Sequence, residues 1–89
     1  MIWNLKISDQ AKRHLAKIDR PDRERILRFV HDRVLTLDEP TDLGTPLKGH
    51  ELGSYWRFRV GDYRIICDLQ SDVLVVLMVD VGHRSKIYR

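Results

Sequence analysis

The chain contains little cysteine and no long apolar run. Its 89 residues include one cysteine, Cys67, so an internal disulfide is excluded and a reducing compartment is expected. The longest apolar stretch, Val73 to Val79, is far shorter than the ~18–20 residues of a membrane-spanning helix. The first residues do not combine a basic region, an apolar segment and a cleavage site, so no signal peptide is expected. These absences predict a cytoplasmic protein without a membrane partner.

Phosphate loops and metal-ligand patterns are also missing. The five glycines form no glycine-rich phosphate-binding loop, and His14, His31 and His50 lack metal-ligand spacing. We therefore expect neither a metal nor a cofactor. Charge is present instead, since 16 Lys and Arg against 13 Asp and Glu leave a net +3 at pH 7. This mild excess hints at an anionic partner without identifying it.

Hydrophobic periodicity predicts the first half of the fold. With 43% hydrophobic residues, 89 residues support a single core, and we expect one domain spanning residues 1–89. The alternation of Trp3, Leu5 and Ile7 with polar residues is typical of a half-buried strand. Two amphipathic helices should follow, the first capped by Ser8 or Asp9 and the second running from about residue 21 to residue 40.

The second half predicts a meander of three strands. Residues 55–60 and 63–69 alternate about a tight turn at Gly61-Asp62, and residues 73–81 are apolar on both faces. Residues 41–53 form a connecting loop whose leucines pin it to the core. The order β-α-α-β-β-β predicts an α+β fold, with two N-terminal helices packed on a twisted, mainly antiparallel four-stranded sheet.

The hairpin at Gly61-Asp62 contains a charge conflict. A two-residue turn places Arg59 directly opposite Arg64 and puts Arg57 on the same face, away from the apolar core face. Like charges opposite each other destabilise a sheet by roughly 0.2–1 kcal/mol. A bound polyanion reverses the sign of that interaction, so the pair predicts a phosphate-binding face.

The last strand extends this face. With a turn at Ser71-Asp72, Arg64 lies beside Val79, and alternation carries Val81 and His83 onto the arginine side. Arg84 and Tyr88 follow in a basic terminal segment. Guanidinium groups bind phosphate oxygens in forked pairs, and His83 and Tyr88 can exchange protons with a hydroxyl group. Any one surface arginine is more often merely solvated, so the prediction depends on three segments converging on one face.

Four segments of the chain together resemble the RelE family of toxins within the RelE/ParE toxin–antitoxin superfamily. They are Trp56-Arg57-Phe58-Arg59-Val60-Gly61-Asp62-Tyr63-Arg64, Val79-Asp80-Val81-Gly82-His83-Arg84, Leu47-Lys48-Gly49 and Ile87-Tyr88. The resemblance covers nearly the whole chain. It implies a small α+β domain that enters the ribosomal A site and cleaves mRNA there without a metal, the RNA 2′-hydroxyl attacking the adjacent phosphate.

The resemblance also implies roles for individual residues. Arg64 and Arg84 match the phosphate-binding arginines, Tyr88 matches the catalytic tyrosine, and His83 occupies a position that is basic in related members. The residues expected to contact the RNA backbone are Arg57, Arg59, Lys48 and Lys86. The general base stays open between Tyr88 and His83, because free histidine has the better-matched pKa while nearby arginines lower that of a tyrosine.

Two other functions compete with mRNA cleavage. A ParE-like toxin has the same fold and inhibits DNA gyrase, and a small basic module can bind RNA without cutting it. The resemblance implies a RelB-like antitoxin as protein partner, with the ribosome and mRNA as targets and operator DNA contacted only through the antitoxin. The apolar residues expected to be exposed on the arginine face, and so to accept the antitoxin, are Ile66, Val75 and Leu77.

Overall fold

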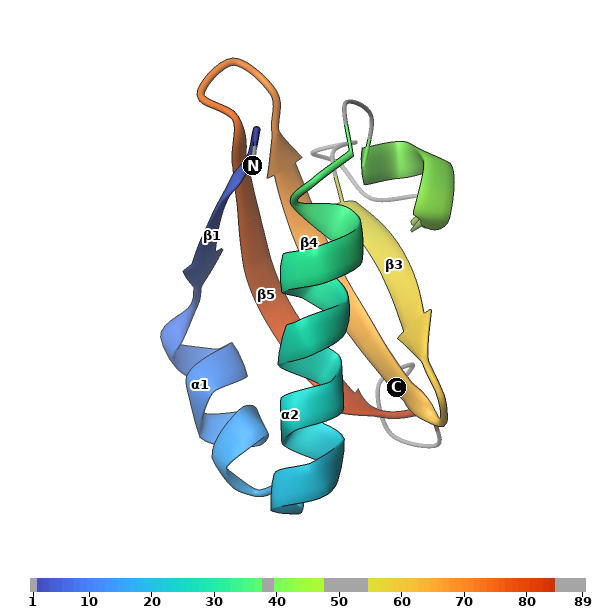
Figure 1. The fold of residues 1–89 in the computed structure, drawn as a ribbon. Helices are drawn as coiled ribbons and strands as arrows, with labels where there is room; N and C mark the ends of the chain where they lie inside the picture. The colour runs from blue at the N-terminus through green and yellow to red at the C-terminus, as the bar shows by residue number, and fades with distance from the viewer. Residues whose placement is uncertain (1, 38–39, 48–54, 85–89) are drawn as a thin grey trace.

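The computed structural model describes residues 2–37, 40–47 and 55–84. A five-stranded sheet in the order β1-β5-β4-β3-β2 carries two helices on one face (Figure 1). The strands are β1 (Asn4–Ile7), β2 (Thr45–Pro46), β3 (Tyr55–Val60), β4 (Tyr63–Gln70) and β5 (Val75–His83). Only β1 and β5 are parallel; the other three pairings are antiparallel. The predicted α+β class is confirmed, and β2 adds a fifth strand to the expected four.

The extra strand arises within the segment that was expected to be a loop. Pro40–Leu43 forms a short 3-10 helix, and Thr45 and Pro46 then pair with Arg57 and Trp56 of β3. Leu43 packs against the core, as predicted for a pinning leucine. Gly44 lies so close to Phe58 that a Cβ atom there would sit 2.9 Å from the phenyl ring. The close approach of this backbone to Phe58 explains why no side chain is accommodated at position 44.

The helical part of the chain is α1 (Asp9–Ala16) and α2 (Arg20–Phe29), the latter continued by a π-helical segment, Val30–Val34. The second helix was expected to reach Pro40, but the helical run ends earlier. Leu35 donates its N–H to the Val30 carbonyl at 3.0 Å, an i→i+5 bond that closes the π turn. No helix in the described part of the chain is both long and apolar enough to cross a membrane.

The core lies between the helices and the sheet. Residues from each helix and each long strand are almost fully buried, among them Ala11, Ile26, Phe58, Ile65, Val76 and Met78. The alternation predicted for the first strand is confirmed, because Trp3 is buried while Asn4 and Lys6 are exposed. At the edge of β5, His14 of α1 contacts Asp80, with Nδ1 and Oδ1 2.6 Å apart.

Ser8 joins the start of α1 to the sheet. Its Oγ accepts the Ala11 N–H at 3.1 Å as an N-cap, as predicted, and donates to the Val79 carbonyl at 2.8 Å. We expect Ser8→Ala to lower the free energy of unfolding by about 1–2 kcal/mol, because it removes a helix cap and leaves a part-buried carbonyl without its donor. Urea denaturation measures this loss. Ser8→Thr retains the hydroxyl and serves as the control; equal destabilisation by both variants would contradict the explanation.

Cys67 is buried in β4, as expected for a small core residue. Burial raises the pKa of its thiol, and Asp68 adds to the shift. Because the thiolate is the reactive form, we expect Cys67 to react with a disulfide reagent at least about 100-fold more slowly in the native protein than in urea. Thiol release measured by absorbance tests this expectation. Equal rates in both states would show that the strand opens readily.

Candidate functional site

The hairpin of β3 and β4 brings two arginines together. Arg59 pairs with Arg64 and Phe58 pairs with Ile65, which confirms the predicted register. The turn residue Gly61 has a φ of +59°, the left-handed region that a two-residue turn with glycine in its first position requires. The conflict between Arg59 and Arg64 is therefore a real feature of the sheet face that the helices leave open.

Arg64 is held by the backbone of its own hairpin. Its side chain is largely buried, and Nη1 donates to the Gly61 carbonyl at 3.3 Å and to the Tyr63 carbonyl at 3.1 Å. A guanidinium carries five N–H donors, so its Nε and Nη2 donors remain for other acceptors. No described residue accepts a hydrogen bond from them. A fixed cation with unused donors suits the binding of a phosphate oxygen.

The pairing of Arg64 with β5 differs from the prediction. Arg64 lies opposite Gly82 instead of Val79. Two causes combine: the connecting turn spans residues 71–74, and a bulge interrupts the ladder between Ile66 and Cys67. Arg84 nevertheless comes to the same end of the sheet, because its backbone N–H donates to the Asp62 carbonyl at 2.9 Å. Arg59, Arg64 and Arg84 thus lie around one hairpin turn, and these three residues are here called the arginine cluster. Arg57 lies farther along β3.

His83 and Val81 lie on the face opposite the one expected. Val81 is buried in the core beside Ile65, and His83 pairs with Tyr63, their rings making an edge contact at 5.8 Å. Tyr63 in turn donates its hydroxyl to Asp22 of α2 at 3.4 Å, which fixes this side as the helix side. A bulge adds one residue to a strand, and each single-residue shift reverses the faces of the residues beyond it. The structure therefore separates His83 from the face that carries Arg64.

Tyr63 is an ionisable group near the cluster that sequence reasoning left aside. Partial burial raises the pKa of its phenol, and the neighbouring Asp22 carboxylate raises it further. The phenol therefore stays protonated at neutral pH and acts as a donor to Asp22. This excludes Tyr63 as a general base under those conditions.

Other expected site residues have different outcomes. Lys48, Lys86 and Tyr88 lie outside the described residues. Ile66 and Val75 are buried and Leu77 is half-buried, so the expected exposed apolar patch for an antitoxin is wrong at the first two positions. The exposed large apolar side chains of the described residues are instead Ile2, Val73 and Leu74.

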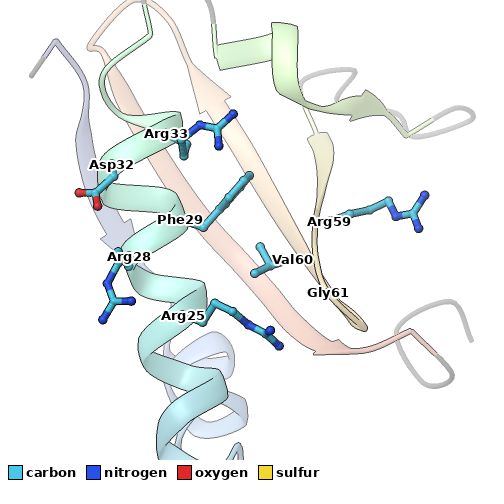
Figure 2. A pocket seen from close by; sticks show the side chains of 8 residues that line it. All are labelled: Arg25, Arg28, Phe29, Asp32, Arg33, Arg59, Val60 and Gly61. Carbon is cyan, nitrogen blue, oxygen red and sulfur yellow. The ribbon is translucent and has the colours of Figure 1, made fainter.

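A groove on the helix side was not expected. Arg25, Phe29 and Arg33 of the second helical segment face the end of β3 across it (Figure 2). Their spacing of four residues in the sequence predicts that the three side chains share one face of the helix, because residues at i and i+4 lie on the same face. Phe29 is half-buried against the core, while Arg25 and Arg33 are exposed beside it.

A family model supplies the relationship that this geometry suggests. The model, described as the ParE toxin of the type II toxin–antitoxin system parDE, matches residues 5–88. The chain belongs to this toxin family. It is accordingly a toxin of the RelE/ParE superfamily of type II toxin–antitoxin systems. No curated protein sequence matches the toxin closely enough to count as a relative.

Solved structures share the fold of this toxin. The RelBE2 toxin–antitoxin complex of Mycobacterium tuberculosis matches with a TM-score of 0.81 at 24% identity, over 94% of this chain and 100% of that one. The RelE–RelB complex of Pyrococcus horikoshii OT3 matches at 0.76 and 25%, over 97% and 99% of the two chains. The intact RelBE complex of E. coli matches at 0.74 and 18%, over 91% and 95%. The RelE-like fold is confirmed.

Proposed function

We propose that this toxin is a ribosome-dependent mRNA interferase, an endoribonuclease that cleaves mRNA in the A site without a metal ion. The observation that carries the proposal is the arginine cluster. Three arginines lie around one hairpin turn through their backbone positions, and two hydrogen bonds to backbone carbonyls fix the Arg64 guanidinium there. Such a cluster is disfavoured by itself and is stabilised by a phosphate that carries negative charge.

The chemistry assigns a role to each group. The 2′-hydroxyl loses its proton to a base and its oxygen bonds to the adjacent phosphorus, while the bond from phosphorus to the 5′-oxygen breaks. The leaving oxygen takes up a proton, so the products are a cyclic phosphate and a free 5′-hydroxyl. Arg64 and Arg84 stabilise the charge that grows on the phosphoryl oxygens. Arg57, Arg59, Lys48 and Lys86 hold the RNA backbone on either side.

The general base in this proposal is Tyr88 or His83. The position of His83 beside Tyr63, across the sheet from Arg64, favours Tyr88 as the partner of the arginines. Comparing Tyr88→Phe with His83→Ala in the cleavage assay decides between them. Normal cleavage by the tyrosine variant together with inactivity of the histidine variant would overturn this preference.

The partners follow from the same proposal. The solved structures with this fold include RelB–RelE complexes, which supports a RelB-like antitoxin as the partner of this toxin. The antitoxin would carry any contact with operator DNA, and the ribosome with its mRNA would be the target in the cytoplasm.

Gyrase inhibition is the second candidate, because the matching family model is named for ParE. Primer extension on mRNA from translating ribosomes incubated with the purified toxin separates the two. We expect cleavage between the second and third codon positions in the A site. Intact mRNA, combined with cleaved DNA in a gyrase reaction, would reject the interferase and support the ParE-like activity.

A further inference from the structure

The groove between the second helix and the hairpin is a candidate binding site on the side away from Arg64. It has a volume of about 410 Å³ and lies between α2 with its π-helical continuation and the end of β3. Its lining is made of four arginines, one aspartate and a short apolar stretch: Arg25, Arg28, Arg33, Arg59, Asp32, Phe29, Val60 and Gly61. The groove is thus bordered by both cationic and apolar residues.

Figure 2 shows which of these side chains point into the groove. Phe29 extends from the helix toward Val60 of β3, and Arg25 and Arg33 extend in the same direction one turn before and one turn after it. Arg28 and Asp32 point to the far side of the helix, and the Arg59 side chain extends from β3 away from the helix. The part of the groove open to a ligand is therefore formed by Phe29 and Val60, with one arginine at each end.

The two flanking arginines differ in their surroundings. Arg25 donates from Nη2 to Asp22 at 3.1 Å, and this same nitrogen lies 3.0 Å from the position that a Cβ atom would take at Gly61. Arg33 forms no ion pair with any residue in the described ranges. The charge of Arg33 is therefore available to a ligand, and Gly61 leaves room for the Arg25 guanidinium against the turn.

The rim of the groove includes an open strand edge. Leu47 donates its N–H to the Tyr55 carbonyl at 3.1 Å, so Tyr55 directs its backbone groups outward from the sheet. Outward-facing residues alternate along a strand, which makes Arg57 and then Arg59 the next two. Thr45 lies opposite Arg57, but no strand among the described residues pairs with Arg59. At this edge the Arg59 N–H and carbonyl are therefore a hydrogen-bond donor and acceptor with which the backbone of another chain can pair.

The spacing of these features fits a peptide in extended form. Arg33 follows Arg25 by eight positions along the helical segment, a rise of about 12 Å. Residues i and i+4 of an extended chain point to the same side and lie about 13 Å apart, with residue i+2 between them. An acidic residue at each outer position then meets an arginine, and an apolar residue at the middle position meets Phe29 and Val60.

We propose that this groove binds an extended segment of a partner protein with the pattern acidic-x-apolar-x-acidic. Carboxylates accept forked hydrogen bonds from the two arginines, and the segment's backbone pairs with Arg59. The open strand edge favours a peptide over RNA, because a ribose-phosphate chain lacks the alternating donors and acceptors that a strand offers. The site shares only Arg59 with the arginine cluster, because the peptide pairs with the Arg59 backbone while Arg64 faces the other side of the sheet.

Fluorescence anisotropy of labelled peptides with the full chain tests the proposal. The probe is a nine-residue peptide with Asp-Thr-Leu-Thr-Asp at its centre, and the matched peptides carry Asn for both Asp, or Ser for Leu. We expect each change in the peptide, and Arg33→Glu or Arg25→Glu in the toxin, to weaken binding at least about tenfold. Arg13→Glu, an equal change of charge on exposed α1, should weaken it less than about threefold.

Three outcomes would overturn the proposal. One is binding by Arg33→Glu within threefold of the unchanged toxin, and another is equal affinity for the Asn peptide. The third is tighter binding of a six-residue oligouridylate than of the peptide, weakened by the same Arg33→Glu and Arg25→Glu substitutions. That result would make the groove an RNA site. Circular dichroism confirms that each variant is folded. Because the assay contains no ribosome, its result is independent of whether the toxin cleaves mRNA.

Discussion

Arg84→Ala should reduce the rate of A-site mRNA cleavage by about 100-fold or more. Removing one preorganised donor from a developing oxyanion typically costs 10²–10³ in rate. Arg84 is exposed, and the contact that places it beside the turn is made by its backbone N–H, which alanine retains. Stability should therefore be almost unchanged while activity is lost. Single-turnover primer extension with saturating toxin measures the rate, and thermal unfolding checks the fold.

Arg64 needs a milder substitution because its side chain supports the hairpin. Arg64→Lys keeps a positive charge but loses the forked geometry, so we expect impaired cleavage in a folded protein. Arg13→Ala, an exposed arginine on α1, is the control and should cleave at the normal rate. If Arg84→Ala or Arg64→Lys cleaves as fast as this control, the arginine cluster is not the phosphate-binding site.

Phe58→Ala should lower the free energy of unfolding by about 3–5 kcal/mol. Phe58 is 1% exposed, pairs with Ile65 across the hairpin and packs against the backbone at Gly44, so its removal opens a cavity between β3 and the 3-10 segment. Small domains have a total stability of about 5–15 kcal/mol, and a loss of this size leaves a large unfolded fraction at 37 °C. Urea denaturation followed by circular dichroism measures the change.

An exposed apolar residue provides the comparison. Val73 is 58% exposed in the turn before β5, and we expect Val73→Ala to change the unfolding free energy by less than about 0.5 kcal/mol. A loss below about 1 kcal/mol for Phe58→Ala would show that the surrounding residues collapse into the space or that the ring packs loosely. Similar losses for both variants would contradict the distinction between core and surface.

The first hairpin was predictable because its information is local. Gly61-Asp62 specifies a two-residue turn, and that turn alone fixes Arg59 opposite Arg64. The capping of α1 was predictable to within one residue, Ser8 or Asp9, for the same reason, since the Ser8 bond spans three residues. Both predictions depend on backbone geometry within a few residues of the motif.

The second hairpin was predicted with the wrong register because its determinants are distant. The longer turn at residues 71–74 shifts β5 by two residues, which by itself preserves the faces. The bulge beside Ile66 then reverses them, and near this point β1 ends, with Ile7 paired to Met78. The Val79 carbonyl there accepts from Ser8, 71 residues away in the sequence. Alternation within the strand itself contains no sign of that contact.

The sequence by itself determined the α+β order of elements, the arginine pair and the cap of α1, because each depends on periodicity or on a turn of few residues. Only the tertiary structure decided that His83 lies across the sheet from Arg64, that Ile66 and Val75 are covered, and that Arg25 and Arg33 flank a groove against β3. These features depend on which segments pack together and on a single-residue bulge. Long-range packing sets both, and a pattern confined to one strand or one helix does not encode it.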